Sequence, residues 1–139
     1  MFIDASALVA ILLREPDGQA FAERVDAAAR RLTSGLSAYE AAVAIARASG
    51  MPIDRARRLL TTFLDRAGVE TVPLCEAERE IAFDAFDRFG KGRHPASLNM
   101  GDCFAYACAR ANGVPLLFKG DDFTQTDVWA AKLGGFPKP

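Results

Sequence analysis

The sequence predicts an α/β fold of the three-layer α/β/α sandwich type, in which helices cover both faces of a central, mainly parallel sheet. Short apolar runs such as MFID (1–4) and VPLLF (114–118) are typical of strands buried on both faces. Between them lie stretches with apolar residues at every third or fourth position, as in amphipathic helices. This alternation implies βαβ crossovers. Because 139 residues are the length of one domain, we expect a single domain over residues 1–139.

Four strands and six helices are expected in chain order. The strands are MFID, the weaker candidates RLTSG (31–35) and VETVP (69–73), and VPLLF. The helices are Ser6–Arg14, Gly18–Arg31, Ser37–Ser49, Ile53–Arg66, Glu76–Phe89 and Asn99–Asn112. Turn residues separate several of them, for example Gly50 and Pro52 between the third and the fourth. The longest irregular segment is GKGRHPASLN (90–99), which carries three potential cations.

Composition argues against a membrane protein and a disulfide-bonded protein, but it does not identify a binding partner. The formal net charge is −1, so affinity for a nucleic acid would have to come from a local basic patch. No apolar run reaches the length of a membrane span and the N-terminus lacks the basic start of a signal peptide, so we expect a cytoplasmic protein without a membrane segment. The three cysteines, Cys75, Cys103 and Cys108, have no CxxC spacing, and we expect neither a disulfide nor a zinc site.

Acidic residues follow the predicted strands or begin the helices that face them. Asp4 ends the first strand, Glu40 and Asp102 stand near the starts of two helices, and Asp121 and Asp122 follow the last strand. The carboxyl ends of parallel strands and the N-termini of the following helices share one edge of the sheet, where ligands bind. These acids are therefore expected to converge although they are far apart in the sequence.

Each acid except Asp4 also has a purely structural interpretation. Glu40 is three residues after Ser37 and Asp102 is three residues after Asn99, which is the spacing of a capping box. Asp121 and Asp122 after Gly120 are ordinary turn chemistry. Asp4 needs a partner, a metal or water, because an unpaired carboxylate at the end of a buried strand has a large desolvation cost. The joint occurrence at one sheet edge favours a functional site.

Converging carboxylates repel one another unless a cation neutralises them. Ligands that are all oxygen, with no paired histidine or cysteine, favour Mg²⁺ or Mn²⁺ over zinc. Such a site is suited to hydrolysis of a phosphodiester by a metal-activated water. The pattern therefore predicts a metal-dependent hydrolase.

Four motifs carry a family resemblance: MFIDASALVAIL, LSAYEAAVAI, SLNMGDCFAYACA and PLLFKGDDFTQTDV. In this order and spacing the chain resembles the PIN-domain ribonucleases, specifically the VapC toxins of toxin–antitoxin pairs, over nearly its whole length. The resemblance implies an endoribonuclease that depends on Mg²⁺ or Mn²⁺. It also implies a cognate antitoxin that inhibits the enzyme, an RNA substrate and a homodimer.

The resemblance makes Asp4, Glu40 and Asp102 the core acids of the metal site. Asp122 is expected to be the fourth catalytic acid, with Asp121 as the alternative ligand, because the place where many relatives have an aspartate is Gly120 here.

Further residues match supporting positions of the family. Ser6 and Asn99 are either supports for the site or only helix caps, and Asp127 has a structural or supporting role.

Cations beside the acids are candidates for phosphate contact. Lys119 adjoins the last acidic motif, and Lys91 and Arg93 lie in the loop before Asp102, as does His94. Arg55, Arg57 and Arg58 form a second basic cluster, either a solvated helix face or part of the antitoxin surface. Apolar stripes in 41–48 and 53–64 could form an antitoxin groove, or could pack in the core or a dimer interface.

Two other classes of function remain open from the sequence. A phosphohydrolase with an aspartate nucleophile would need a second aspartate two residues after Asp4, where this chain has Ser6. A non-catalytic RNA- or protein-binding domain on the same fold is the other alternative, since fold does not guarantee activity. The sequence names no particular RNA as the target.

Overall fold

Four short parallel strands form the central sheet of the computed structural model, which describes residues 1–131 and 133. They are β1 (Phe2–Ile3), β2 (Leu32–Ser34), β3 (Glu70–Val72) and β4 (Leu116–Leu117). Their order in the sheet is β3-β2-β1-β4, and every pairing is parallel. The predicted single domain runs to residue 139, so its last part lies outside the described residues.

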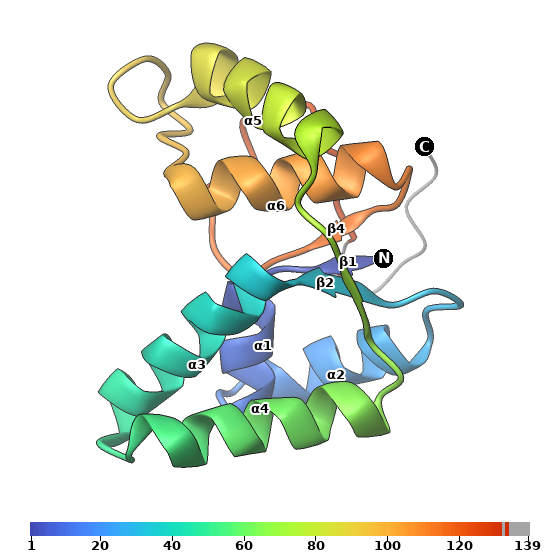
Figure 1. Ribbon diagram of the computed structural model, residues 1–139, viewed down its shortest axis with the longest axis vertical. Coiled ribbons are helices and arrows are strands. Elements are labelled where there is room, and N and C mark those ends of the chain that lie inside the picture. Colours follow the sequence, from blue (N-terminus) through green and yellow to red (C-terminus); the bar gives the residue numbers. More distant parts are fainter. Residues whose placement is uncertain (132, 134–139) are drawn as a thin grey trace.

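Six helices connect and cover the strands in the described part of the chain. They are α1 (Ala5–Leu12), α2 (Gly18–Asp26), α3 (Gly35–Ser49), α4 (Ile53–Arg66), α5 (Glu76–Phe89) and α6 (Met100–Ala111). Helices α5 and α6 lie on one side of the sheet and α1 to α4 on the other (Figure 1). The predicted three-layer α/β/α sandwich with a parallel sheet is thus confirmed.

The two faces of the sheet bury two separate hydrophobic cores. Phe2 and Leu116 belong to the core under α5 and α6, whereas the next residues in each strand, Ile3 and Leu117, belong to the core under α1 to α4. Successive side chains of a strand point to opposite faces, so even a two-residue strand contributes to both cores. All four side chains are fully buried. This explains why β1 and β4 are apolar without alternation.

Two of the predicted helices end two or more residues earlier than expected. Helix α1 stops at Leu12 rather than Arg14, and Arg14 has a positive φ of 52°. Helix α2 stops at Asp26 rather than Arg31, because the chain must leave the helix to enter β2. The Arg31 guanidinium instead donates hydrogen bonds to backbone carbonyls of the turn and of Ala67.

In the described residues, no helix combines the length and the apolar character that crossing a bilayer requires.

The strand order determines where a ligand site is expected. From β1 the chain first builds outward through β2 and β3, and then returns to add β4 on the other side of β1. The connections therefore diverge between β1 and β4, and in open parallel sheets the crevice for ligands lies at such a point, outside the carboxyl ends of the strands.

Candidate active site

A pocket of about 460 Å³ opens at this point of the sheet. Its walls come from the ends of β1 and β4, from α1 and α3, and from the start of α6. The lining residues are Asp4, Ala5, Ser6, Val9, Glu15, Glu40, Ala44, Asp102, Lys119 and Asp122. All four predicted catalytic acids, Asp4, Glu40, Asp102 and Asp122, thus line one pocket, which we call the acid pocket.

Asp4 is buried at the end of β1, and it is the N-cap of α1. Its Oδ2 accepts hydrogen bonds from the backbone N–H of Ser6, at 3.1 Å, and from the Ser6 hydroxyl, at 2.5 Å. Burial raises the pKa of Asp4 above its ordinary value, although the Ser6 bonds favour the charged form. The proposed role of Ser6 as an N-cap is wrong, because Asp4 occupies that position.

Ser6 links the end of β1 to the end of β4, its neighbour in the sheet. Its hydroxyl oxygen accepts a hydrogen bond from the backbone N–H of Lys119, at 3.0 Å, while the hydroxyl proton goes to Asp4. Lys119 is the second residue after β4. The orientation of the Asp4 carboxylate is therefore tied to the end of the neighbouring strand, which agrees with a supporting role for Ser6.

Glu40 reaches the pocket from the second turn of α3. The capping box expected between Ser37 and Glu40 is wrong, because the helix begins at Gly35 and Ser34 is the N-cap, whose hydroxyl accepts a hydrogen bond from the Ser37 N–H at 3.1 Å. The structural alternative for Glu40 is thereby lost. Burial, with repulsion from Asp4 and Asp102, raises the pKa of Glu40 to about 7.

Asp102 combines a capping role with a place in the pocket. The capping box predicted with Asn99 is confirmed: the Asn99 N–H donates to Asp102 Oδ2 at 3.0 Å, and the Asp102 N–H donates to Asn99 Oδ1 at 2.9 Å. Burial raises the pKa of Asp102 to about 6, against the effect of the Asn99 bond, and Asp4 and Asp122 add repulsion. Asn99 therefore holds the Asp102 side chain as well as capping α6.

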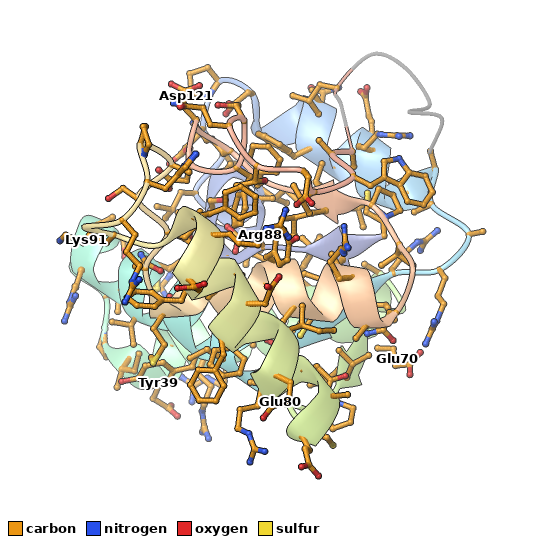
Figure 2. The ribbon with its side chains drawn as sticks, turned by 90° about the horizontal axis from the view of Figure 1, so that it is seen from above. Tyr39, Glu70, Glu80, Arg88, Lys91 and Asp121 are labelled. Atoms are coloured by element: carbon orange, nitrogen blue, oxygen red, sulfur yellow. The ribbon has the colours of Figure 1, made fainter. Side chains whose placement is uncertain are left out.

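The two aspartates after β4 differ in position. Asp122 lines the acid pocket, and its charge acts on Asp4 and Asp102. Asp121 is not among the lining residues, and Figure 2 shows it at the outer edge of the molecule. This difference favours Asp122 as the fourth acid. Both side chains are exposed, in contrast to Asp4.

The donor chemistry of the acid pocket fits a hard divalent cation. Three of its carboxyl groups have raised pKa values because they are buried near one another, which is the condition that a bound cation relieves. In the part of the chain that the structure describes, no three His, Cys, Asp or Glu side chains already form a group that could hold an ion.

The predicted phosphate contacts differ in their surroundings. Lys119 lines the pocket, and its ammonium pairs with Glu15 and with Asp17, the latter at 3.0 Å. Arg93 pairs with Asp87 at 3.1 Å. Lys91 projects from the edge of the molecule in Figure 2. Among these three, the structure brings only Lys119 into the acid pocket.

Sequence reasoning missed one charged lining residue, Glu15. It lies in the turn between α1 and α2, and no motif or capping pattern singled it out. Asp127, by contrast, lies outside the acid pocket: it accepts hydrogen bonds from the Tyr106 hydroxyl and the Arg88 guanidinium, both at 2.7 Å. Its role is therefore structural, one of the two roles that the sequence left open.

The basic cluster of α4 lies at a separate, smaller pocket of about 300 Å³. Arg57 and Arg58 pair with Asp54 on the surface of the helix. Arg55 and Arg58 line the pocket with the apolar residue Leu59. The cluster is thus a solvated face with an apolar groove beside it.

Comparison with known proteins agrees with this fold. Residues 1–128 match the PIN domain family. The VapC ribonuclease Mb0640 of Mycobacterium bovis is 45% identical over 133 residues, which cover 96% of this chain and 99% of that protein. The ribonuclease VapC of Mycolicibacterium smegmatis is 45% identical over 130 residues, covering 94% of this chain and 98% of the relative. The VapC ribonuclease R02377 of Rhizobium meliloti is 39% identical and covers 91% of this chain and 98% of its own length.

The fold, the acid pocket and these matches together define a PIN-domain protein. The chain belongs to the PIN-domain family, within the group of VapC toxins. The resemblance inferred from the sequence motifs is thereby confirmed.

Proposed function

We propose that the protein is a Mg²⁺- or Mn²⁺-dependent endoribonuclease toxin that hydrolyses phosphodiester bonds of RNA at the acid pocket. One observation carries the proposal: Asp4, Glu40, Asp102 and Asp122 come from four separate segments and line a single pocket at the carboxyl edge of the sheet. The ribonuclease names of the VapC relatives supply the reaction and the substrate class. Oxygen-only donors supply the reason for a hard divalent ion.

The four acids are assigned as the ligands, and a bound divalent ion supplies charge neutralisation at the phosphate and activation of water. Ser6 and Asn99 hold the carboxylates of Asp4 and Asp102 through the hydrogen bonds described above. Lys119, at the pocket wall, is assigned to the phosphate backbone of the substrate. Two of the three protons of its ammonium face Glu15 and Asp17, which leaves one donor for a phosphate oxygen.

The proposal includes partners and a cellular place. An active ribonuclease harms its own cell, so we assign a cognate antitoxin as its inhibitor and the cytoplasm, where RNA is available, as its location. The groove beside Arg55, Arg58 and Leu59 is the candidate antitoxin surface. Exposed apolar side chains on α3, α5 and α6, such as Tyr39 and Phe83, support a homodimer. A monomeric mass at micromolar concentration in light scattering would contradict the dimer.

Cleavage of a panel of total RNA and tRNA by antitoxin-free protein tests the activity. The reactions contain Mg²⁺ or Mn²⁺, with EDTA and a folded Asp4→Asn variant as controls. Asparagine keeps the size of the side chain and an acceptor for Ser6, so the fold is retained while the charge is lost. We expect discrete cuts that require the metal and disappear in the variant. No cleavage by metal-loaded, folded protein would favour a non-catalytic RNA- or protein-binding domain.

A further inference from the structure

Gly101, in the first turn of α6, is buried against the carboxylate of Glu40. A Cβ atom placed on Gly101 would lie 2.2 Å from Glu40 Oε2 and 2.6 Å from Oε1. Real Cβ contacts essentially never fall below 3.0 Å. The carboxylate of Glu40 therefore occupies the space that any side chain at position 101 would need.

The backbone does not require a glycine at this position. Gly101 is a helical residue and is not among the glycines with positive φ. Glycine in a helix is less favourable than alanine by up to about 1 kcal/mol. The chain therefore carries a poor helix former where an alanine would suit the helix, and the close approach of Glu40 is the contact that accounts for it.

Two other glycines show that this contact is of a distinct kind. A Cβ on Gly18 would lie 2.3 Å from the backbone carbonyl oxygen of Ala10, so there the glycine permits packing of α2 on α1. A Cβ on Gly35, at the start of α3, would meet nothing within 4 Å. At Gly101 the atoms in the way belong to the end of a flexible side chain in the acid pocket.

We propose that Gly101 is a positioning residue of the active site: its missing side chain lets the Glu40 carboxylate lie against the start of α6, beside Asp102, as the metal site requires. The inference rests on the proposed function, since it assigns Glu40 as a ligand. Glu40 and Asp102 come from different helices, so the spacing between α3 and α6 and the volume at position 101 together determine how closely the two carboxylates approach.

The substitution Gly101→Ala separates this role from folding. The end of the Glu40 side chain can turn away at little cost, whereas backbone atoms cannot, so the variant is expected to fold with a melting temperature equal to or above that of the wild type. Its Glu40 carboxylate is displaced from the acid pocket. Gly35→Ala is the matched control, because it makes the same change in the first turn of a helix without a contact.

Calorimetric titration with Mn²⁺ measures the effect without reference to activity. We expect Gly101→Ala to bind Mn²⁺ at least about 10-fold more weakly than the wild type, the size of effect seen when the support of a metal ligand is lost. Gly35→Ala is expected to match the wild type within about twofold, as is usual for a surface substitution. Equal Mn²⁺ affinity in Gly101→Ala and the wild type would overturn the inference.

Shortening Glu40 tests whether the alanine acts through it. Glu40→Asp alone withdraws the carboxylate by one methylene and weakens Mn²⁺ binding. In the Gly101→Ala background the same shortening removes the collision, so the double variant is expected to bind Mn²⁺ more tightly than the sum of the two losses predicts. Strict additivity would contradict the inference. If Gly101→Ala does not fold, a folded double variant supports the contact and an unfolded one overturns it.

Carbon-13 NMR of the glutamate carboxyl groups keeps this inference separate from the proposed function. If the wild type binds neither Mn²⁺ nor Mg²⁺, the proposed function fails, but the contact between Gly101 and Glu40 is still measurable. A shift of the Glu40 carboxyl signal in Gly101→Ala and not in Gly35→Ala supports the positioning role. An unchanged Glu40 signal overturns it.

Discussion

Two groups of charged residues in this protein shift the pKa values of their carboxyl groups in opposite directions. In the acid pocket, Glu40 and Asp102 are partly buried near other acids, and their pKa values rise to about 7 and about 6. At the other group, partial burial opposes the charge of Asp127, but hydrogen bonds from Tyr106 and Arg88 outweigh it and lower its pKa. Arg110 adds a further cation at 3.8 Å. We call this second group the Asp127 network.

The contrast separates a carboxylate that neighbouring side chains stabilise from carboxylates that lie close to other acids. The Asp127 network is complete within the chain, and it joins α5 and α6 to the segment after β4. The acid pocket leaves its carboxylates without matching cations: among the described residues, Lys119 is the only basic side chain that lines it, and its ammonium is already shared by Glu15 and Asp17. Unbalanced charge of this kind clusters at functional sites.

The largest expected difference between the two groups is in activity. Asp102→Asn retains an acceptor for the Asn99 N–H but loses a ligand charge, so we expect RNA cleavage to fall by at least about 100-fold. Asp127→Asn changes the same atoms outside the pocket, and its cleavage rate is expected to stay close to that of the wild type. Initial rates on one RNA substrate at saturating Mg²⁺ measure both. Comparable losses of cleavage rate in the two variants would contradict the distinction between the acid pocket and the Asp127 network.

Proton competition at the acid pocket is expected to have the next largest effect. At pH 6 most Glu40 side chains, with a pKa of about 7, carry a proton that a metal ion must displace. Mn²⁺ affinity is therefore expected to fall about tenfold between pH 8 and pH 6, and binding near pH 7 should release protons. Calorimetry in buffers of different ionisation enthalpy detects this release. Affinity that does not change over this range would argue against Glu40 as a ligand.

The two groups are also expected to give stability opposite dependences on pH. Without metal, folded Glu40 keeps its proton up to about pH 7, whereas the unfolded chain loses it near 4.5, so this group makes the free energy of unfolding decrease as pH rises between these values. The pKa of Asp127 is lowered, so its contribution decreases as pH falls into the acid range.

Urea unfolding at a series of pH values, followed by circular dichroism, measures both slopes. Glu40→Gln should flatten the slope between pH 4.5 and 7, and Asp127→Asn should flatten the acid limb. A Glu40→Gln variant with the wild-type slope would show that another group titrates there.

The smallest expected effect is at Tyr106. This side chain is buried, and its hydroxyl donates to Asp127 at 2.7 Å. Tyr106→Phe removes that hydrogen bond without leaving a cavity, so we expect a loss of about 1 kcal/mol in the free energy of unfolding. Cleavage activity should be unchanged, because the Asp127 network does not line the acid pocket. Denaturation midpoints with an RNA cleavage assay check both halves of this expectation.

Much of the fold was predictable because the local signals were strong. Each predicted strand segment contains a strand, and Gly50 ends α3 in the left-handed conformation that its place in the sequence predicts. Boundaries were less certain where tertiary contacts decide them, as at the end of α2, where Arg31 bonds to the backbone of Ala67. The N-cap of α3 also moved to Ser34, since serines at both 34 and 37 are suitable caps and only the position of β2 selects between them.

The sequence by itself determined the order of strands and helices, the family and the set of acids, because periodicity, motifs and residue types are local properties of the chain. Tertiary structure decided which of these residues meet. It placed Asp122 rather than Asp121 in the acid pocket, added Glu15 to its wall, and brought Glu40 against Gly101. The physical reason is that the packing of helices determines the distances between charged side chains to within a few ångströms. The charge balance of the site and the pKa values of its groups depend on these distances, so they cannot be predicted from the sequence alone.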